Sequence, residues 1–252
     1  MFKRLAKNLF RRKPAPLATG SADADDFDWV TYNEAYAKQM LGFEKDHTSK
    51  LASGDFQVAE DGSIQLSDQV KPLHPNHRCL YETIGALAAR SVIELGCGGG
   101  DHLHNIGEIY PQLDRWGYDR SDGQLDFLRA RSPHLAGIVQ ARDMTQPHTA
   151  DLRQADVVYT QAVIMHIHAG DGHLVAMTNA CKMATRAVVL MENWERHDYI
   201  ADLKALHAEG KIDWPELHFS FRRLDGRPYI LIASPQPTGF ETLDNLDVLR
   251  GA

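Results

Sequence analysis

Residues 92–100 read VIELGCGGG, and this stretch constrains the fold more than any other part of the chain. Val92, Ile93 and Leu95 form a short apolar run that predicts a buried strand. The glycine-rich turn that follows can adopt positive φ and can lie directly against a ligand, because it has almost no side chains. Apolar spacing resumes after Asp101 and predicts a helix. Such a strand, loop and helix hold nucleotide-type ligands at the carboxyl end of a parallel strand.

The glycine spacing differs from that of dinucleotide-binding loops. Those loops read G-x-G-x-x-G and turn a helix N-terminus toward a pyrophosphate. Here the spacing is G-x-G-x-G, with Glu94 before it and Asp101 after it. Two carboxylates would repel a pyrophosphate, whereas they suit a ligand that has an ammonium and a sulfonium group. An NAD-dependent oxidoreductase stays open as an alternative, since it would use the same type of fold.

The stretch resembles motif I of class I S-adenosylmethionine (SAM)-dependent methyltransferases, which commonly reads as hydrophobic residues followed by E/D-x-G-x-G-x-G. The resemblance extends over about residues 75–234. It implies a doubly wound, mostly parallel seven-stranded α/β sheet that ends in an antiparallel hairpin. It also implies SAM as the cofactor, held by the loop residues Glu94, Gly96, Cys97, Gly98, Gly100 and Asp101.

Beyond the loop the chain alternates between predicted strands and helices, which by itself indicates a doubly wound α/β sheet. A helix over 74–90 leads into the first strand. Further strands are expected over 116–119, 137–141, 155–160 and 187–191, and further helices over 121–131, 170–185 and 197–209. Strands 219–223 and 229–233 flank a turn signal and predict the terminal antiparallel pair.

Two acidic residues that follow predicted strands are candidates for binding adenosine. A carboxylate at Asp119 can accept hydrogen bonds from both ribose hydroxyls, and the resemblance implies that role, with Arg120 beside it. The resemblance also implies that Asp143 accepts a hydrogen bond from the adenine amino group. Met144 could pack on the ring, because its sulfur is polarisable. The alternative for each acid is an ordinary turn or N-cap residue.

The strand over 155–160 resembles motif IV of the same family, which implies that Gln161 touches the methionine end of the cofactor. The following VIMHI stretch resembles a segment of many small-molecule methyltransferases, including sugar-modifying ones. Within it, His166 is the candidate general base, because an unperturbed pKa near 6.5 suits removal of a proton from a hydroxyl. The alternative is a structural histidine that bonds a backbone carbonyl.

Three residues after the fifth predicted strand, Glu192, Asn193 and Trp194, are candidates for holding acceptor hydroxyls or stacking on a sugar ring. An ordinary polar loop is the alternative. The histidines around His166 also raise the question of a metal site. However, His-x-His spacing turns the two rings to different faces of a strand or helix, and three widely spaced cysteines form no cluster. No metal is expected.

Charge and hydropathy divide the chain into unequal parts. Residues 1–13 hold six basic residues and no acid, with apolar residues at helical spacing, whereas the net charge of the whole chain is −7. The acidic body disfavours a nucleic-acid substrate. We expect a basic amphipathic segment over 1–13, a linker over 14–28, an N-terminal helical cap over 29–73 that ends in an irregular or hairpin stretch, and a SAM-binding domain over 74–252.

These patterns predict methyl transfer from SAM to a small hydroxylated acceptor, a sugar or a lipid-linked glycan, with O-methylation favoured by the absence of an Asn/Asp-Pro-Pro-Tyr/Phe motif. A non-catalytic scaffold with a SAM-type fold is a further alternative. No apolar run long enough to span a membrane is present. We therefore expect a cytoplasmic protein, in which residues 1–13 bind the membrane surface or form a solvated tail.

Overall fold

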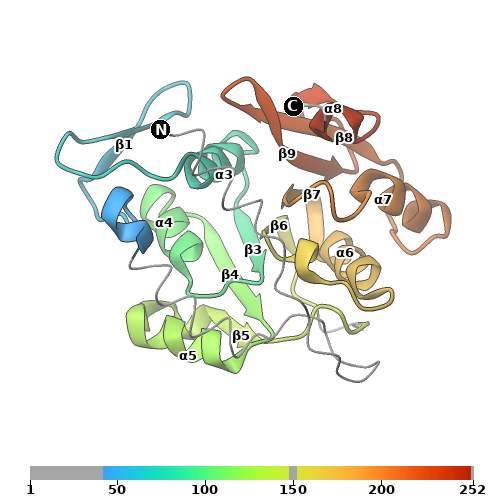
Figure 1. Ribbon diagram of the computed structural model, residues 1–252, viewed down its shortest axis with the longest axis horizontal. Helices are drawn as coiled ribbons and strands as arrows, with labels where there is room; N and C mark the ends of the chain where they lie inside the picture. Colours follow the sequence, from blue (N-terminus) through green and yellow to red (C-terminus); the bar gives the residue numbers. More distant parts are fainter. Residues whose placement is uncertain (1–41, 148–151, 251–252) are drawn as a thin grey trace.

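The computed structural model describes residues 42–147 and 152–250 (Figure 1). The segments predicted over 1–13 and 14–28, and the part of the cap up to residue 41, lie outside the described residues. An eight-stranded sheet in the order β10-β8-β9-β7-β6-β3-β4-β5 forms the centre of the molecule. Its parallel part consists of β3 (Ser91–Leu95), β4 (Asp114–Asp119), β5 (Val139–Ala141), β6 (Ala155–Gln161) and β7 (Ala184–Met191).

The antiparallel part confirms the predicted terminal hairpin. It consists of β8 (His218–Leu224), β9 (Arg227–Ser234) and β10 (Glu241–Thr242). Seven of the eight strands correspond to the predicted ones. The prediction of seven strands missed β10, which pairs with the outer edge of β8. A strand of two residues shows no periodicity in the sequence, so only its pairing in the fold reveals it.

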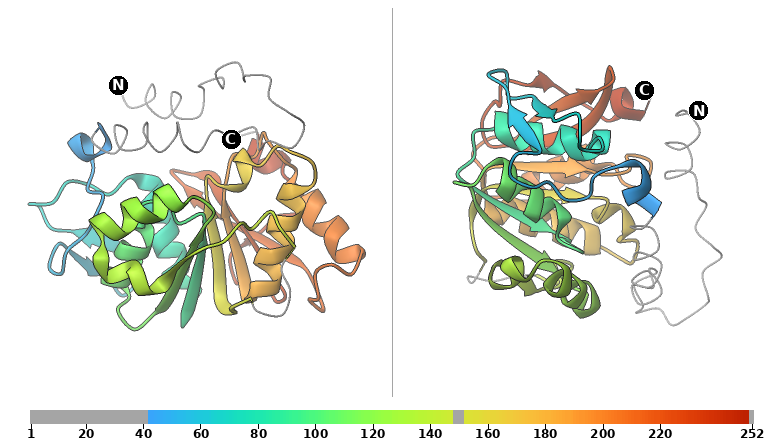
Figure 2. Two further views of the ribbon diagram at one scale, coloured as in Figure 1. Left: turned by 90° about the horizontal axis from the view of Figure 1, so that it is seen from below. Right: turned by 90° about the vertical axis from the view of Figure 1, so that its left-hand side faces the viewer.

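Helices cover both faces of the sheet, as the alternation predicted (Figure 2). They are α3 (Pro75–Ala86), α4 (Asp101–Ile109), α5 (Asp122–Arg131), α6 (Gly172–Met183), α7 (Tyr199–Ala208) and α8 (Asp247–Arg250), with short 3-10 segments η1 (Pro133–Ile138) and η2 (Ile164–His166). Side chains alternate along β3. Val92 therefore packs in one core with α3 and α4, and Ile93 packs in the other with α6 and α7.

Local sequence signals explain two helix starts. Ser121 Oγ accepts a hydrogen bond from the Gln124 N–H (3.3 Å), so Ser121 caps α5 in the Ser-x-x-Gln pattern of a capping box. Pro75 begins α3, and its fixed φ suits a first helical position. The helix predicted over 74–90 ends earlier, because Leu87 forms the C-cap and Ala88 has a φ of 48°.

The N-terminal segment reaches the sheet through a short helix over 42–46 and a hairpin. The hairpin pairs β1 (Phe56–Val58) with β2 (Ile64–Leu66) and turns at the Asp61-Gly62 signal. Leu51 and Ile64 are buried in the same core as α3. Among residues 42–147 and 152–250, no helix is long and apolar enough to cross a membrane.

Candidate functional site

The glycine loop (residues 96–100) joins β3 to α4 at the carboxyl edge of the parallel strands. Gly96 and Gly100 have φ values of 75° and 77°. A Cβ at Gly96 would collide with the side chain of Val163, and a Cβ at Gly100 would lie 2.6 Å from Leu128 Cδ1. Both the left-handed backbone and the close approach of neighbours therefore require glycine at these positions.

Backbone N–H groups of the glycine loop point inward, at the end of β4. The N–H groups of Gly96 and Cys97 both donate to the Tyr118 carbonyl oxygen, at 2.7 and 3.0 Å. The Gly98 N–H donates to Asp119 Oδ2 at 2.8 Å. A loop that binds pyrophosphate keeps its N–H groups for the ligand. In this loop the protein itself occupies these three, and the Gly100 N–H donates to the Cys97 carbonyl oxygen at 2.9 Å.

Two buried carboxyl groups lie beside the loop. Asp119 is 7 % exposed, and its Oδ1 accepts a second hydrogen bond, from the Ser121 N–H at 2.8 Å. Burial raises the pKa of Asp119. Glu94 is 2 % exposed, and its pKa is raised well above the ordinary value by burial and by the neighbouring Asp119 and Asp101. Such a concentration of carboxyl groups favours a cationic ligand, because positive charge offsets their repulsion.

The structure gives partners of their own to two other predicted loop residues. The carboxylate of Asp101 pairs with Arg131 Nη1 at 3.0 Å, at the end of α5. Arg131 also reaches Glu44 at 3.3 Å, so this pair connects α4, α5 and the N-terminal segment. The Cys97 thiol is buried in the α5 core, where burial raises its pKa. Only the backbone of Cys97 faces the loop's hydrogen-bond network.

The residues predicted to bind adenosine lie together at the ends of β4 and β5. The Arg142 N–H donates to the Asp119 carbonyl oxygen at 2.9 Å, which holds the two ends side by side. Asp143 Oδ1 accepts hydrogen bonds from the N–H and the hydroxyl of Thr145, at 2.9 and 2.7 Å. These two bonds close a turn at the end of β5. Arg120 is exposed, and Met144 is buried in the core.

The end of β6 has an unusual backbone conformation. Ala162 has a φ of 54°, and its N–H donates to the Met191 carbonyl oxygen at 3.0 Å. A non-glycine residue in this region stores strain of about 1–3 kcal/mol, and such residues concentrate at functional sites. Gln161 precedes it, and its Oε1 lies 2.9 Å from His102 Nε2.

Glu192 is buried and has several hydrogen-bond partners in the fold. Its carboxylate accepts hydrogen bonds from the Thr160 hydroxyl (2.7 Å) and from the N–H groups of Val163 (3.1 Å) and Met165 (3.0 Å). Burial raises its pKa, and these bonds oppose the rise. Glu192 thus holds the turn that follows β6.

The two residues after Glu192 also have structural partners. Asn193 Oδ1 accepts a hydrogen bond from the Glu195 N–H at 2.9 Å, which closes a local turn. Trp194 is 9 % exposed and packs edge-to-face on Tyr199, with ring centroids 5.6 Å apart. The predicted sugar-stacking surface of Trp194 is therefore mostly covered by the core.

His166 lies on η2, within the turn that Glu192 holds. Burial, together with the neighbouring His168 and Arg196, lowers its pKa to about 4. The imidazole is therefore neutral at neutral pH. His173 and His197 stack at 4.2 Å nearby. In the part of the chain that the structure describes, no group of three His, Cys, Asp or Glu residues is arranged to hold a metal ion.

Three polar residues to which the sequence patterns assigned no role lie behind this site. Tyr81, His102 and Asn105 form a hydrogen-bonded chain between α3, α4 and β6. The spacing of His102 and Asn105, three residues apart on α4, is the one available signal, because it places both on one helix face. Their partners are distant in sequence, so the pattern alone could not identify them.

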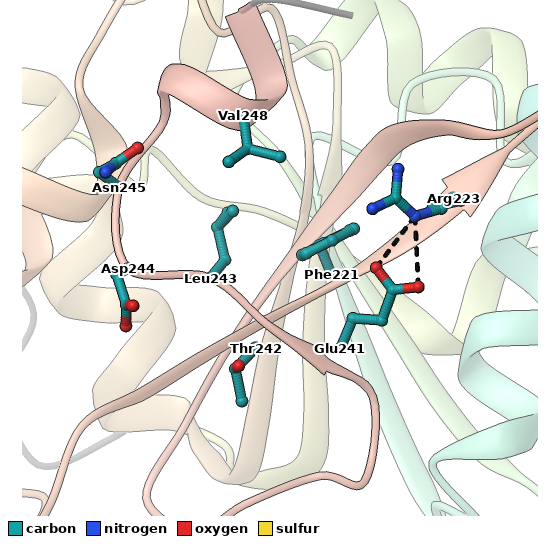
Figure 3. A pocket seen from close by; sticks show the side chains of 8 residues that line it. All are labelled: Phe221, Arg223, Glu241, Thr242, Leu243, Asp244, Asn245 and Val248. Carbon is teal, nitrogen blue, oxygen red and sulfur yellow. Dashed lines mark hydrogen bonds and ion pairs between the residues drawn. The ribbon is translucent and has the colours of Figure 1, made fainter.

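A hollow of about 330 Å³ lies at the antiparallel end of the sheet, away from these residues. Figure 3 shows its lining, in which Arg223 and Glu241 pair at 2.9 Å. Strands β9, β7 and β6 separate β8 from β3. None of the predicted site residues lines this hollow.

No protein-family model matches the chain, and no curated protein matches it. Solved structures do match. A TehB-like SAM-dependent methyltransferase from Corynebacterium glutamicum is similar with a TM-score of 0.51 and 17% identity, over 81% of this chain and 97% of that chain. A magnesium protoporphyrin IX methyltransferase from Synechocystis has a TM-score of 0.45 and 18% identity, over 86% and 99% of the two chains. The first similarity shows that the chain has the fold of class I SAM-dependent methyltransferases.

Proposed function

We propose that the chain binds SAM at the carboxyl ends of β3, β4 and β6 and transfers its methyl group to a small hydroxylated acceptor. The inward-pointing N–H groups of the glycine loop, beside the buried carboxyl groups of Glu94 and Asp119, are the observation on which this rests. Because the N–H groups are already engaged and the neighbouring groups are carboxyls, this loop favours a cationic ligand over an anionic one. An NAD-dependent oxidoreductase would need those N–H groups for its pyrophosphate.

The residues present fit the adenosine part of SAM. Each carboxylate oxygen of Asp119 accepts one backbone N–H and keeps further acceptor capacity. Asp119 would therefore accept the ribose hydroxyls without giving up the loop. Arg120 follows β4 and Asp143 follows β5. We assign the adenine side to these strand ends, where Asp143 would accept from the adenine amino group in addition to its bonds to Thr145. The acidic surroundings of Glu94 suit the charged methionine end.

The methyl group of SAM is attached to a positively charged sulfur and leaves readily. The main task of the protein is then to align the acceptor oxygen with that group. His166 would accept the hydrogen of the acceptor hydroxyl, because its imidazole is neutral at neutral pH. A pKa of about 4 makes it a weak base, so orientation of the hydroxyl is its larger contribution.

Sequence features support the acceptor class. The VIMHI stretch resembles small-molecule methyltransferases, and the acidic net charge of −7 disfavours nucleic acid. We therefore propose O-methylation of a sugar or a lipid-linked glycan. Residues 1–13 lie outside the described residues, and their contact with an anionic membrane surface is proposed from their basic, amphipathic sequence alone.

Calorimetric titration with SAM, S-adenosylhomocysteine and NAD tests the cofactor. We expect the first two to bind and NAD not to bind. Binding of NAD without SAM would overturn the proposal. Transfer of a labelled methyl group from SAM to a panel of sugars, glycolipids and simple alcohols then tests catalysis. Tight SAM binding with no turnover on any acceptor would favour the non-catalytic scaffold instead.

Sedimentation with anionic liposomes tests the membrane contact. We expect the full chain to sediment with the liposomes and a chain without residues 1–13 to stay in solution. Equal sedimentation of the two chains would refute a role of this segment. High salt should release the full chain, because the attraction between basic residues and anionic lipid is screened.

A further inference from the structure

A chain of hydrogen bonds leads from the N-terminal segment to the end of β6. Its first hydrogen bond can run in only one direction. The Leu51 N–H can only donate, and it donates to Asn105 Oδ1 at 2.8 Å. The orientation of the buried Asn105 amide is thereby fixed. Its nitrogen then donates to the Ser49 carbonyl oxygen at 2.9 Å and to the Tyr81 hydroxyl oxygen at 3.0 Å.

The next two bonds pass through His102. Its Nδ1 lies 2.9 Å from the Tyr81 hydroxyl, and its Nε2 lies 2.9 Å from Gln161 Oε1. Because Tyr81 accepts from Asn105, its own hydrogen can be donated to His102 Nδ1. The ring then has its hydrogen on Nε2 and donates it to Gln161. Burial lowers the pKa of His102, which is consistent with a neutral ring that has a single hydrogen.

This arrangement decides which end of the Gln161 side chain remains available. His102 engages the amide oxygen, so the amide nitrogen with its two hydrogens is the end left for a ligand. Gln161 ends β6, the strand next to β3. It immediately precedes the strained Ala162, and Val163, the residue after that, packs closely against Gly96 of the glycine loop. A pair of N–H donors at this place suits a carboxylate.

We propose that His102 is a positioning residue, which holds the Gln161 amide so that its nitrogen donates to the carboxylate of the methionine part of SAM. This inference rests on the proposed function. It assigns to Tyr81 and Asn105 the task of fixing the His102 ring, and it connects residues 49–51 to the cofactor. No acceptor takes part, so the inference can be tested by binding alone.

Two probes separate this role from a purely structural one. S-adenosylhomocysteine has the methionine-type carboxylate, and its decarboxylated analogue lacks it. Titration calorimetry with the His102→Phe variant should show about a tenfold loss of affinity for S-adenosylhomocysteine, the size expected for one charge-assisted hydrogen bond. The affinity for the decarboxylated analogue should stay that of the unmodified protein.

Matched variants complete the design. Gln161→Leu should reproduce the selective loss from the other end of the contact, and it decides the question if His102→Phe fails to fold. His102→Gln should restore part of the affinity, since its amide can still donate to Gln161. His104→Phe is the control. His104 lies on the same helix and contacts the Leu51 carbonyl oxygen at 2.8 Å, but it contacts His134 rather than Gln161.

The outcomes are distinct. A selective loss in both His102→Phe and Gln161→Leu, with no loss in His104→Phe, would support the proposal. An equal loss for both probes, or no loss for either, would overturn it. If the unmodified protein binds neither S-adenosylhomocysteine nor SAM, the proposed function fails first, which is a different result from the failure of the positioning role.

Discussion

The two halves of the site are built in different ways. The donor half, which we propose binds SAM, consists of the glycine loop and the ends of β4 and β5, where side chains bond backbone groups at the ends of adjacent elements. Asp119, for example, accepts hydrogen bonds from Gly98 and Ser121. The acceptor half, which we propose faces the acceptor, consists of residues 162–166 and 192–198. There the Glu192 carboxylate bonds Thr160 and the turn after β6, with partners 27 to 32 residues away in the sequence.

This difference indicates how each half responds to change. The donor half depends on backbone conformation and on carboxyl groups that a ligand must offset. The acceptor half depends on one buried side chain and a neutral histidine. Substitutions should therefore affect cofactor binding in the first half and turnover in the second. Four measurements test that separation, and they follow in order of decreasing expected effect.

Replacement of Asp119 by alanine should have the largest effect. It removes the proposed ribose contact and leaves the N–H groups of Gly98 and Ser121 without their acceptor. Each unpaired buried group costs about 1–3 kcal/mol, so we expect a loss of S-adenosylhomocysteine affinity of about 100-fold or more and a lower melting temperature. The exposed Asp122 at the start of α5 is the control, and its alanine variant should bind normally. Unchanged binding by the Asp119 variant would refute its role.

Replacement of Gly96 by alanine should affect both halves, so that cofactor affinity and turnover both fall. An alanine at this position would be strained by the positive φ, and its Cβ would collide with Val163 of the acceptor half. A strain of about 1–3 kcal/mol predicts roughly a tenfold loss of affinity and a measurable loss of turnover. Adding Val163→Ala should restore only part, since the collision is relieved and the φ strain remains. Gly137→Ala, where nothing lies within 4 Å of the new Cβ, should change neither quantity.

Replacement of Glu192 by glutamine should lower turnover while cofactor affinity stays nearly normal. One carboxylate oxygen becomes a donor that faces the N–H groups of Val163 or Met165, so the turn that holds His166 loosens. At a cost of about 1–3 kcal/mol we expect kcat to fall about tenfold, with nearly normal affinity for S-adenosylhomocysteine. A fall in affinity as large as the fall in kcat would mean that the two halves are not independent.

A change of pH near neutrality should have the smallest effect on kcat. Because the pKa of His166 is lowered from 6.5 to about 4, its ring stays neutral as the pH falls through 6.5. The acid limb of kcat should therefore lie near pH 4 rather than near pH 6.5. A limb near pH 6.5 would show that another group is the base or that the ring is more exposed during catalysis.

The same lowered pKa has a consequence for stability. The unfolded chain binds a proton at His166 below pH 6.5, whereas the folded chain resists it down to about pH 4. The free energy of unfolding should thus decrease as the pH falls through this window. His74, also lowered to about 4, should contribute in the same direction. Urea unfolding of the unmodified protein and of His166→Asn at pH 7 and pH 5 measures the His166 share.

The succession of strands and helices along the chain was predictable because its signals are local. The β3–loop–α4 unit, the Ser121 cap and the terminal hairpin all follow from neighbouring residues that set backbone conformation. The strand β10 was not predictable, since two residues pair with β8 only once the sheet exists. The functional assignments followed the same rule. Asp119 lies at the predicted strand end beside the loop, whereas Trp194, proposed to stack on a sugar, packs on Tyr199.

What the amino-acid sequence determined by itself is the glycine loop and the sheet that presents it, because glycines and apolar spacing act through the local backbone. What only the tertiary structure decided is which polar groups are already engaged. Asp101 meets Arg131, Glu192 meets the turn after β6, and His102 meets Gln161, in each case across at least 27 residues of chain. Hydrogen-bond partners that distant leave no periodic trace in a sequence, so their pairing, and with it the chemistry of the site, appears only in the fold.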